Sequence, residues 1–261
     1  MTDRILSSNT NERVKLFRSL SQKKYRQLHG LYMIHGYKLL EEALKSEVLI
    51  EALLFEESRT ERVTALLGDS HPAPGYLVSK ELYGKICGAN QLEEVAAVVH
   101  IPRENRVRGE RLLALDGIRD PGNMGTILRS AEAFGYQTIL LLNDCVDVFS
   151  PKVARSSMGS LFRLSIFEAG STDLEAYIQQ GFELITSSLE AEELLPGSSK
   201  MTRHILVIGS ESHGVSDGVM DLSTRSLKIP MEGEVESLNA AIAASILMYS
   251  LRLQEGESPG I

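Results

Sequence analysis

Short apolar blocks alternate with amphipathic blocks along the chain, and this pattern predicts strands that alternate with helices. In the first hundred residues the apolar runs predict four strands, at residues 30–35, 48–55, 75–78 and 95–101. Apolar residues at helical spacing predict four helices, at residues 9–28, 36–45, 61–67 and 79–89. This alternation is typical of a small, separate α/β domain, which we place at residues 1–101.

The second part of the chain alternates in the same way, but its predicted strands are apolar throughout. They lie at residues 112–115, 138–142, 162–167, 182–187, 204–209 and 226–229. One helix is predicted to carry Arg129 and to end at Gly135, and three more are predicted at residues 152–158, 173–180 and 237–254. Wholly apolar strands separated by helices indicate a parallel sheet covered on both faces. We therefore expect a linker at 102–110 and a second α/β domain at 111–261.

The stretch LLALDGIRDPGNMGTILRSAEAFG, residues 112–135, predicts a strand, a loop and a helix in succession. Ligands of open parallel sheets bind where strands end and helices begin, so Asp116, Asn123 and the first helical turn are expected at a functional site. Asn123 is expected in the loop or at the helix cap, and the long side chain of Arg129 can reach back over that loop. A capping Asn and a structural Arg would explain the same spacing without any function.

Charge is distributed unevenly along the chain. The formal net charge of -8 argues against a protein that simply coats nucleic acid. Residues 1–38 nevertheless hold eight Lys and Arg against two acidic residues. A solvated helix face and a surface for the RNA backbone both fit this patch. The residues predicted to bind RNA are Arg13, Lys15, Arg18, Lys23, Lys24 and Arg26.

The remaining composition favours a cytoplasmic protein without a metal. Cys87 and Cys145 match no metal or redox spacing, which favours reduced thiols. The six histidines are scattered without ligand spacing, so we predict no metal site. The first ten residues have no secretory pattern. The apolar stretch 240–251 is shorter than the roughly 20 residues that span a bilayer, so we expect no membrane role.

Two loops late in the chain carry candidate chemistry. No dinucleotide fingerprint follows a strand, and neither a P-loop nor a GxSxG elbow is present, which excludes the common nucleotide-binding and hydrolase classes. Instead GSESHG, residues 209–214, and IPMEGEVESLN, residues 229–239, each follow a strand. Glycines beside Glu211 suit a small molecule that bears hydroxyls and an amine. Ser237 is a natural N-cap, and Asn239 is expected in the first turn of the final helix.

Taken together, three ordered motifs resemble those of the SpoU/TrmH family of RNA ribose 2′-O-methyltransferases. The first is Asn123-Met124-Gly125 followed by Arg129-Ser130-Ala131, and the second is Gly209, Glu211 and Gly214 after an apolar strand. The third is Ile229-Pro230-Met231, Gly233 and Ser237-Leu238-Asn239, after which Ala240-Ala241 stands where the family often has Val-Ser. The N-terminal part more loosely resembles a ribosomal-protein-like RNA-binding domain, with Ile34-His35-Gly36 in place of the usual V-E-G.

The resemblance implies an α/β fold in which a smaller RNA-binding α/β domain precedes a parallel-sheet methyltransferase domain with a trefoil knot. It implies S-adenosylmethionine as the cofactor and a homodimer through the last helix. That helix, 237–254, is too apolar all round for a surface helix, so the core or a subunit interface is expected. The implied cofactor-binding residues are Gly209, Glu211, Gly214, Ile229, Met231 and Leu238.

The implied reaction transfers a methyl group to a ribose 2′-hydroxyl, with ribosomal RNA as the expected substrate. The implied catalytic residues are Asn123, Arg129, Glu211, Ser237 and Asn239. The resemblance makes Arg129 the proposed base, but a guanidinium keeps its proton, so we interpret Arg129 as a charged clamp on phosphate and developing alkoxide. A transfer RNA substrate and a non-catalytic RNA-binding protein of the same fold are the alternatives.

Overall fold

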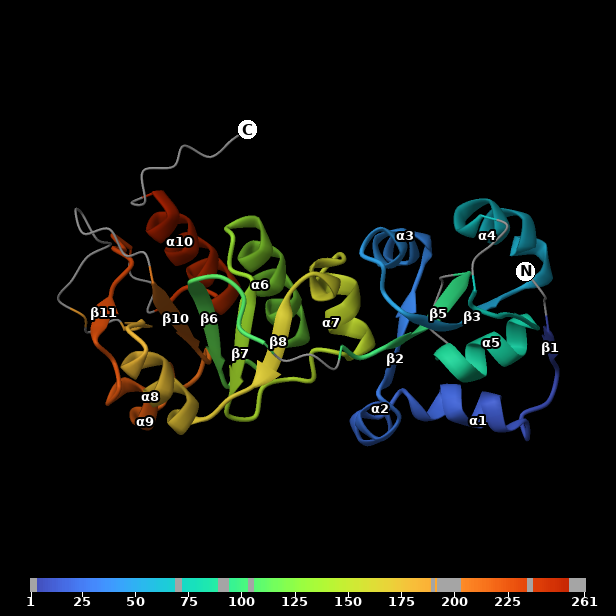
Figure 1. The fold of residues 1–261 in the computed structure, drawn as a ribbon, viewed down its shortest axis with the longest axis horizontal. Helices are drawn as coiled ribbons and strands as arrows, with labels where there is room; N and C mark the ends of the chain where they lie inside the picture. The colour runs from blue at the N-terminus through green and yellow to red at the C-terminus, as the bar shows by residue number, and fades with distance from the viewer. Residues whose placement is uncertain are drawn as a thin grey trace. The chain divides into compact units, whose positions relative to one another are not determined.

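The computed structural model describes residues 4–68, 72–88, 94–102, 106–188, 191, 203–233 and 237–253. Figure 1 shows its fold as a ribbon. The chain divides into two compact units. Unit 1 contains Met1–Arg103 and Asp147–Phe162, and unit 2 contains Glu104–Val146 and Arg163–Ile261.

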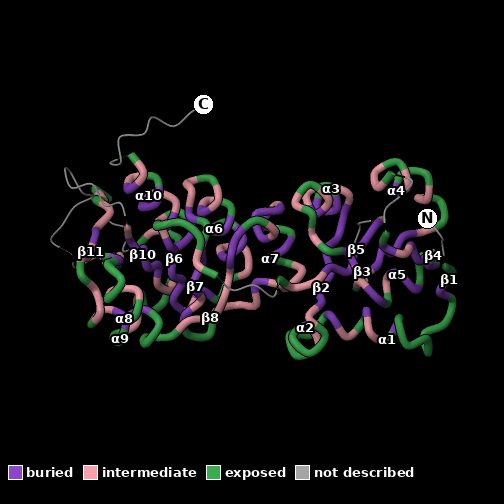
Figure 2. Tube along the Cα trace, viewed as in Figure 1, coloured by how far each residue is buried: buried purple, intermediate pink, exposed green. Residues whose placement is uncertain are grey.

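Unit 1 is built on a five-stranded sheet with the order β1-β4-β3-β5-β2. β5 runs antiparallel to β3 and β2, and the other pairs are parallel. The strands are β1 (Arg4–Leu6), β2 (Leu31–His35), β3 (Ile50–Phe55), β4 (Gly75–Val78) and β5 (Val95–His100). The helices are α1 (Glu12–Ser19), α2 (Lys23–His29), α3 (Tyr37–Lys45), η1 (Glu57–Arg59), α4 (Thr60–Leu67), α5 (Lys80–Cys87), α7 (Pro151–Ser156) and η2 (Ser160–Phe162). The apolar side chains of α1 and α5 bury one face of this sheet, and the strands β2, β3, β4 and β5 are almost wholly buried (Figure 2).

The single helix predicted at residues 9–28 is wrong, because the structure has two helices with a break at residues 20–22. Side chains that hydrogen-bond to the backbone explain the break. The hydroxyls of Ser19 and Ser21 donate to the carbonyls of Leu16 and Arg18, at 2.6 and 2.9 Å. Such local bonds offer backbone groups an alternative to the helix ladder. The sequence pattern does not predict the strand β1, since three residues carry too little periodicity.

Unit 1 also contains α7, although the sequence pattern predicts this helix in the second domain. α7 packs against β2, and the rings of Tyr32 and Phe149 lie 5.0 Å apart between their centroids. The Arg26 guanidinium forms an ion pair with Asp147. The segment Asp147–Phe162 therefore belongs to the packing of unit 1. The expected boundaries at 101 and 111 stay a prediction.

Unit 2 contains a six-stranded sheet with the order β11-β9-β10-β6-β7-β8, and all five strand pairs are parallel. The predicted parallel α/β class is thereby confirmed. The strands are β6 (Arg111–Asp116), β7 (Thr138–Leu142), β8 (Ser165–Glu168), β9 (Glu183–Ser187), β10 (His204–Gly209) and β11 (Arg225–Leu227). The helices are α6 (Pro121–Ala133), α8 (Ser171–Gln179), α9 (Asp217–Met220) and α10 (Ala240–Leu253). The expected knot remains a prediction.

Strand register brings distant loops together at one edge of this sheet. Asp116, the last residue of β6, pairs with Gly209 of β10 on one side and with Leu142 of β7 on the other. The carboxyl ends of three neighbouring strands therefore lie side by side. In open parallel sheets this edge is where ligands bind.

Two helix starts differ from the predictions. Asn123 lies inside the first turn of α6, not in the loop or at the cap, because Asp120 is the N-cap and accepts from the Asn123 backbone N–H at 2.8 Å. α10 begins at Ala240, so Ser237 is not its cap. Asn239 lies just before the helix rather than in its first turn, and its Oδ1 accepts from the N–H groups of Ala241 and Ile242. No helix within the described ranges is long and apolar enough to cross a membrane.

Candidate active site

Three side chains from separate parts of unit 2 form one hydrogen-bonded chain at the carboxyl edge of the sheet. Asn239 Nδ2 donates to Asn123 Oδ1 at 3.0 Å. Asn123 Nδ2 in turn donates to Glu211 Oε1. The helix starts of α6 and α10 supply the two amides, and the loop after β10 supplies the carboxylate. The structure thus brings together three of the five residues predicted to be catalytic.

The direction of this hydrogen-bonded chain is fixed by its two ends. Backbone N–H groups of α10 can only donate, so the Asn239 oxygen must face the helix and its Nδ2 must face Asn123. An ionised carboxylate can only accept, so Glu211 requires the Nδ2 of Asn123. Both amide orientations follow from these partners. Asn123 is thereby held in one orientation at the start of α6.

Arg129 lies on the same helix, about 1.7 turns after Asn123 at 3.6 residues per turn. Its side chain is exposed, and no hydrogen bond or ion pair joins it to another residue of the described ranges. Nearby, the hydroxyls of Ser130 on α6 and Ser245 on α10 lie 2.7 Å apart. This interaction helps to fix the two helices that carry the site. Arg129 is therefore a cation on a fixed helix with its guanidinium available to a ligand.

The loop that carries Glu211 is closed on itself. Ser210 and Gly214 exchange two backbone hydrogen bonds, of 3.0 and 2.9 Å. A Cβ on Gly209 would overlap the backbone of Gly214 and Val215, so only glycine fits there. Gly214 has a φ of +67°, a conformation that L side chains rarely adopt. The two glycines of the second motif thus have a backbone reason to be glycine.

A cleft of about 490 Å³ lies beside this loop. All six residues predicted to bind the cofactor line it: Gly209, Glu211, Gly214, Ile229, Met231 and Leu238. Ser237 lies on the same wall. The volume falls within the range of about 300–1,000 Å³ that is usual for small-molecule sites. The cleft therefore gathers residues from both the second and the third motif.

Sequence reasoning missed several residues of this region. Ser187, the last residue of β9, and Ser188 after it line the cleft. His213 also lines it, and its ring Nδ1 lies 2.7 Å from the Ser212 hydroxyl. His213 and Ser212 stand inside GSESHG, so the motif itself was the available signal. Ser187 and Ser188 carried no signal, because only the neighbouring position of β9 and β10 in the sheet brings them here.

Five of the six residues predicted to bind RNA are exposed in unit 1, namely Arg13, Lys15, Arg18, Lys23 and Lys24. Lys15 pairs with Glu12 at 2.7 Å, and Arg13 lies 3.9 Å from Glu51. The structure contradicts the prediction that Arg26 binds RNA. Arg26 is 4% exposed, its Nε and Nη2 donate to Asp147, and its Nη1 donates to the Leu20 carbonyl at 2.6 Å. All three nitrogens of its guanidinium already donate to groups of unit 1, so Arg26 is not available to RNA.

The two cysteines and the groups that could bind a metal give no sign of a second functional site among the described residues. Cys87 and Cys145 are both free, and burial raises the pKa of the Cys87 thiol to about 12 and raises that of Cys145 as well. Within the described residues, no group of three or more His, Cys, Asp and Glu could hold a metal ion. The absence of a metal stays a prediction.

Comparison with known proteins agrees with this geometry. Residues 110–249 match the SpoU rRNA Methylase family, and residues 11–97 match an MRM3-like substrate binding domain. The 23S rRNA (guanosine(2553)-2'-O)-methyltransferase RlmP of Bacillus subtilis is 29% identical over 95% of this chain and 98% of its own length.

Two solved structures are similar over nearly the whole chain. A putative RNA methyltransferase of the TrmH family from Porphyromonas gingivalis is 34% identical with a TM-score of 0.83, covering 95% of this chain and 99% of its own. An AdoMet-bound rRNA methyltransferase from Sinorhizobium meliloti is 28% identical with a TM-score of 0.83, covering 96% and 98%.

The fold and site are thus those of an α/β RNA methyltransferase with an added N-terminal domain. The chain belongs to the SpoU rRNA methylase family, since the family model covers more than half of its residues. The resemblance expected from the three motifs is confirmed, and with it the enzyme class that uses S-adenosylmethionine.

Proposed function

We propose that this protein transfers a methyl group from S-adenosylmethionine to a ribose 2′-hydroxyl of ribosomal RNA. The observation that carries the proposal is the cleft lined by Gly209, Ile229 and Leu238 next to the Asn123–Glu211 hydrogen bond. The match of residues 11–97 to a substrate binding domain and the rRNA methyltransferase relatives favour ribosomal RNA. Transfer RNA is the alternative substrate.

The cleft fits the cofactor in shape and chemistry. The backbone of Gly214 and Val215 packs where a Cβ of Gly209 would stand, so glycine at this position sets the shape of the loop that walls the cleft. Ile229, Met231 and Leu238 supply apolar wall, while Glu211 and the backbone of Gly214 supply polar groups. Bound S-adenosylmethionine would supply a methyl group on a positively charged sulfur. Gly209, Ile229, Met231 and Leu238 are the residues that would hold the cofactor.

Arg129 acts as a charged clamp. In-line transfer requires the ribose oxygen to be positioned and its developing negative charge to be stabilised. A guanidinium offers a planar fork that binds phosphate with two hydrogen bonds, and it keeps its proton. Arg129 is exposed and has no partner among the described residues, so it is available for a substrate phosphate.

Asn123, Glu211 and Asn239 position the substrate. Asn239 and Glu211 lock the Asn123 amide from both ends, which leaves its second N–H with a defined direction toward a ligand. Glu211 uses Oε1 for this bond, so Oε2 is the oxygen that can accept from a ribose hydroxyl. Ser237 closes the wall of the cleft. The exposed cations of α1 and α2 bind the RNA backbone.

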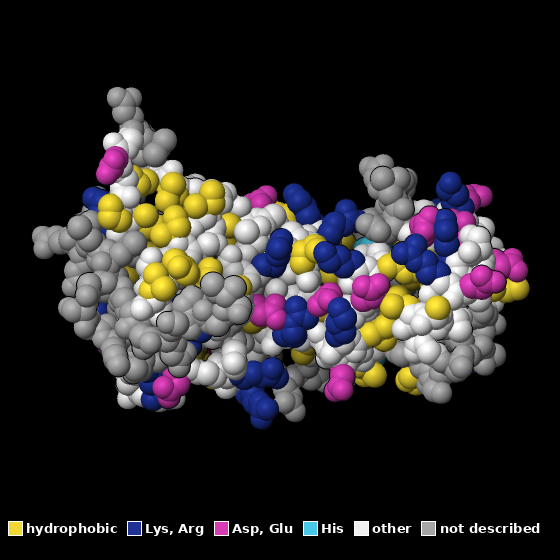
Figure 3. Space-filling model, turned by 90° about the horizontal axis from the view of Figure 1, so that it is seen from above, with side chains coloured by type: hydrophobic (Ala, Val, Ile, Leu, Met, Phe, Trp, Pro, Cys, Tyr) yellow, Lys and Arg dark blue, Asp and Glu magenta, His cyan; other side chains and the backbone are white. Residues whose placement is uncertain are grey.

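A second copy of the chain covers α10. Ile242, Tyr249 and Leu253 are 53%, 45% and 48% exposed, and their spacing of seven and four residues places them on one helix face. Hydrophobic side chains gather on the face of the molecule where α10 lies (Figure 3). An exposed apolar stripe of this kind is typical of an interface. Light scattering tests the homodimer: Ile242→Glu should give a monomer, and Ile5→Glu, at an exposed residue of β1, should not.

The decisive experiment measures transfer of labelled methyl groups to purified, unmodified ribosomal RNA and separately to transfer RNA. Label in ribosomal RNA that disappears in Arg129→Ala is expected. Label in transfer RNA alone would establish the alternative substrate. Calorimetry with S-adenosylmethionine is the companion measurement, since a non-catalytic member would show neither transfer nor binding. We place the reaction in the cytoplasm, as expected from the two free thiols.

A further inference from the structure

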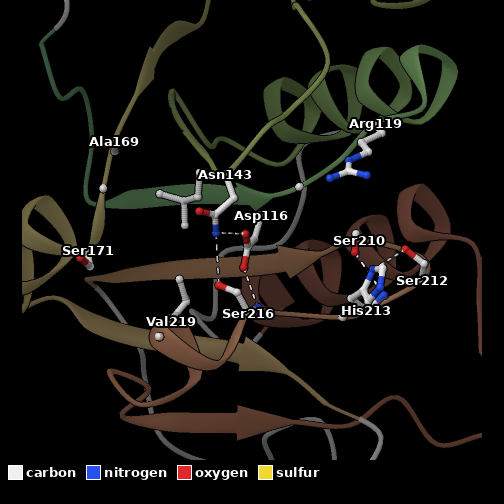
Figure 4. Close-up of a pocket in the computed structure, with 15 residues that line it drawn as sticks. Asp116, Arg119, Asn143, Ala169, Ser171, Ser210, Ser212, His213, Ser216 and Val219 are labelled. Atoms are coloured by element: carbon white, nitrogen blue, oxygen red, sulfur yellow. Dashed lines mark hydrogen bonds between the residues drawn. The ribbon is translucent and has the colours of Figure 1, made fainter.

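A second pocket, of about 500 Å³, lies on unit 2 beside the same loop (Figure 4). Its walls come from the ends of β6 and β7, the start of α8 and the segment 210–219. Ser210, Ser212, His213 and Gly214 line both this pocket and the cofactor cleft. The remaining walls differ, because the cofactor cleft uses residues 187–188, 227–231 and 237–243. One loop thus separates two cavities.

The middle of the second pocket holds a rigid polar cluster. The Asp116 carboxylate is 3% exposed and accepts from Asn143 Nδ2 at 2.6 Å and from the Ser216 backbone N–H at 2.7 Å. Asn143 Nδ2 also donates to the Ser216 hydroxyl at 3.2 Å. These bonds fix the amide with its nitrogen toward Asp116. Asn143 Oδ1 receives no hydrogen bond from any described residue, so it is an oriented acceptor.

Figure 4 shows Arg119, Ser212 and His213 on one side of this cluster and Ser171 on the other. Arg119 is exposed and has no hydrogen-bond or ion-pair partner within the described residues. Leu142, Ala169 and Val219 add apolar surface to the pocket. The pocket thus combines an aliphatic surface, a fixed acceptor, several hydroxyls and one available cation.

This combination matches a nucleotide. The flat face of a base packs on aliphatic surface, and its amino or imino N–H groups require an acceptor such as Asn143 Oδ1. The buried Asp116 charge repels a phosphate from the interior, while Arg119 attracts it. A nucleotide would therefore bind with its base inside and its phosphate at Arg119. Arg119 lies only four residues before Asn123, so the occupant is close in the chain to the proposed reaction site.

We propose that this second pocket binds one unpaired nucleotide of the RNA substrate, outside the target ribose. The inference rests on the proposed function, because it assumes an RNA substrate. An RNA chain that reaches the Asn123–Glu211 pair can place a neighbouring base on the other side of the 210–214 loop. The pocket is thus a positioning and specificity site rather than a place of reaction.

Two substitutions test the pocket by different physical effects. Arg119→Gln removes the cation, and Ala169→Leu fills the cavity with methyl groups. Lys80→Gln, at an exposed lysine outside the basic segment 1–38, is the control for loss of one cation. The KM for transcribed ribosomal RNA should rise about tenfold in Arg119→Gln, the effect expected from removing one charged hydrogen bond. It should also rise in Ala169→Leu, because the larger side chain occupies the space of the base. The kcat should change less than threefold, and S-adenosylmethionine affinity and Tm should equal those of the control.

An unchanged KM in both variants, with normal melting temperatures, would overturn the proposal. Crosslinking locates independently the protein residues that contact the RNA. Ribosomal RNA that contains 4-thiouridine is crosslinked to the protein, and the adducts are mapped by mass spectrometry. Adducts at residues 142–143 or 169–171 support the pocket, and adducts confined to other parts of unit 2 contradict it.

A separate experiment distinguishes an enzyme that does not methylate RNA from a pocket that does not bind a nucleotide. If the wild type methylates no RNA, the four ribonucleoside 5′-monophosphates replace RNA as probes in a nuclear magnetic resonance titration. Shifts at the amides of Ser171 and His213 that disappear in Arg119→Gln then support the pocket. No shift at these amides with any of the four at millimolar concentration overturns it.

Discussion

Asn239 donates a hydrogen bond to Asn123 at 3.0 Å across 116 residues of sequence, and the same Asn239 caps α10 through its oxygen. One side chain therefore joins the start of α10 to the start of α6. The hydrogen bonds that Asn239 Oδ1 accepts from the N–H groups of α10 hold the Asn239 amide in place, and its Nδ2 in turn holds Asn123. Substitutions at Asn239 can separate these two effects.

Asn239→Asp should retain the helix cap but lose the donor to Asn123. We expect kcat to fall about 10²-fold, as for a misplacement near 1 Å, while the melting temperature stays close to that of the wild type. Asn239→Ala should show the same loss of kcat and also lose about 1 kcal/mol of stability, because the cap is gone. Steady-state kinetics and urea unfolding check both. Full activity in Asn239→Asp would remove this residue from the site.

Arg129→Ala should lower kcat by about 10²–10³-fold with little effect on S-adenosylmethionine affinity, since the guanidinium stabilises charge that develops during transfer. Arg129→Lys should recover only a small part, because an ammonium cannot form the two parallel bonds of the guanidinium fork. Single-turnover transfer to ribosomal RNA measures both, with Arg4→Lys as control. A lysine variant with most of the activity would show that charge alone suffices.

Gly209→Ala should abolish S-adenosylmethionine binding. The added Cβ overlaps the backbone of Gly214 and Val215, so the loop must move. Overpacking of this kind costs roughly 1–3 kcal/mol, which urea unfolding would detect. Gly233→Ala is the matched control, since a Cβ there meets open space. Calorimetric binding equal to that of wild type in Gly209→Ala would contradict the dependence of cofactor binding on the shape of this loop.

Cations of α2 should separate into two classes. Lys23→Gln and Lys24→Gln should weaken RNA binding and reduce the slope of log affinity against log salt by about 0.7–0.9 for each phosphate that the variant no longer neutralises. Arg26→Gln should instead destabilise the protein by about 3–5 kcal/mol, because Asp147 loses its buried partner. Fluorescence anisotropy over a salt series measures the first effect. A salt slope unaltered by the lysine changes would exclude this surface.

His35 should make the protein sensitive to acid. Burial first, and then the charge of Arg155, lowers the pKa of His35 from 6.5 to about 4. Between these pH values the unfolded chain binds the proton and the folded chain does not, so the free energy of unfolding falls as the pH drops from 6.5 to 4. The loss is on the order of 3 kcal/mol, at about 1.4 kcal/mol per pKa unit.

His35→Leu should flatten this dependence, and His29→Gln, at an exposed histidine, should not. Urea unfolding at pH 7 and pH 5 distinguishes the two variants. Equal pH dependence in His35→Leu and the wild type would mean that other groups control acid stability.

The sequence by itself determined the class of fold and the identity of most site residues. Wholly apolar strands between helices required a parallel sheet, because such strands must be buried on both faces. The glycines and polar residues of the three motifs stood out where strands end. Local pattern was sufficient for the fold class, whereas the resemblance of the three motifs to the family indicated the site residues.

Only the tertiary structure decided which side chains meet. The order of strands in the sheet placed Asn123 beside Glu211, which is 88 residues away, and brought β9 to the cleft. In unit 1, tertiary packing pairs Arg26 with Asp147 and includes α7. Periodicity reports which face of an element is apolar, but it does not specify the neighbour of that face. The hydrogen-bonded chain of the site depends on those neighbours, so only the folded chain could show it.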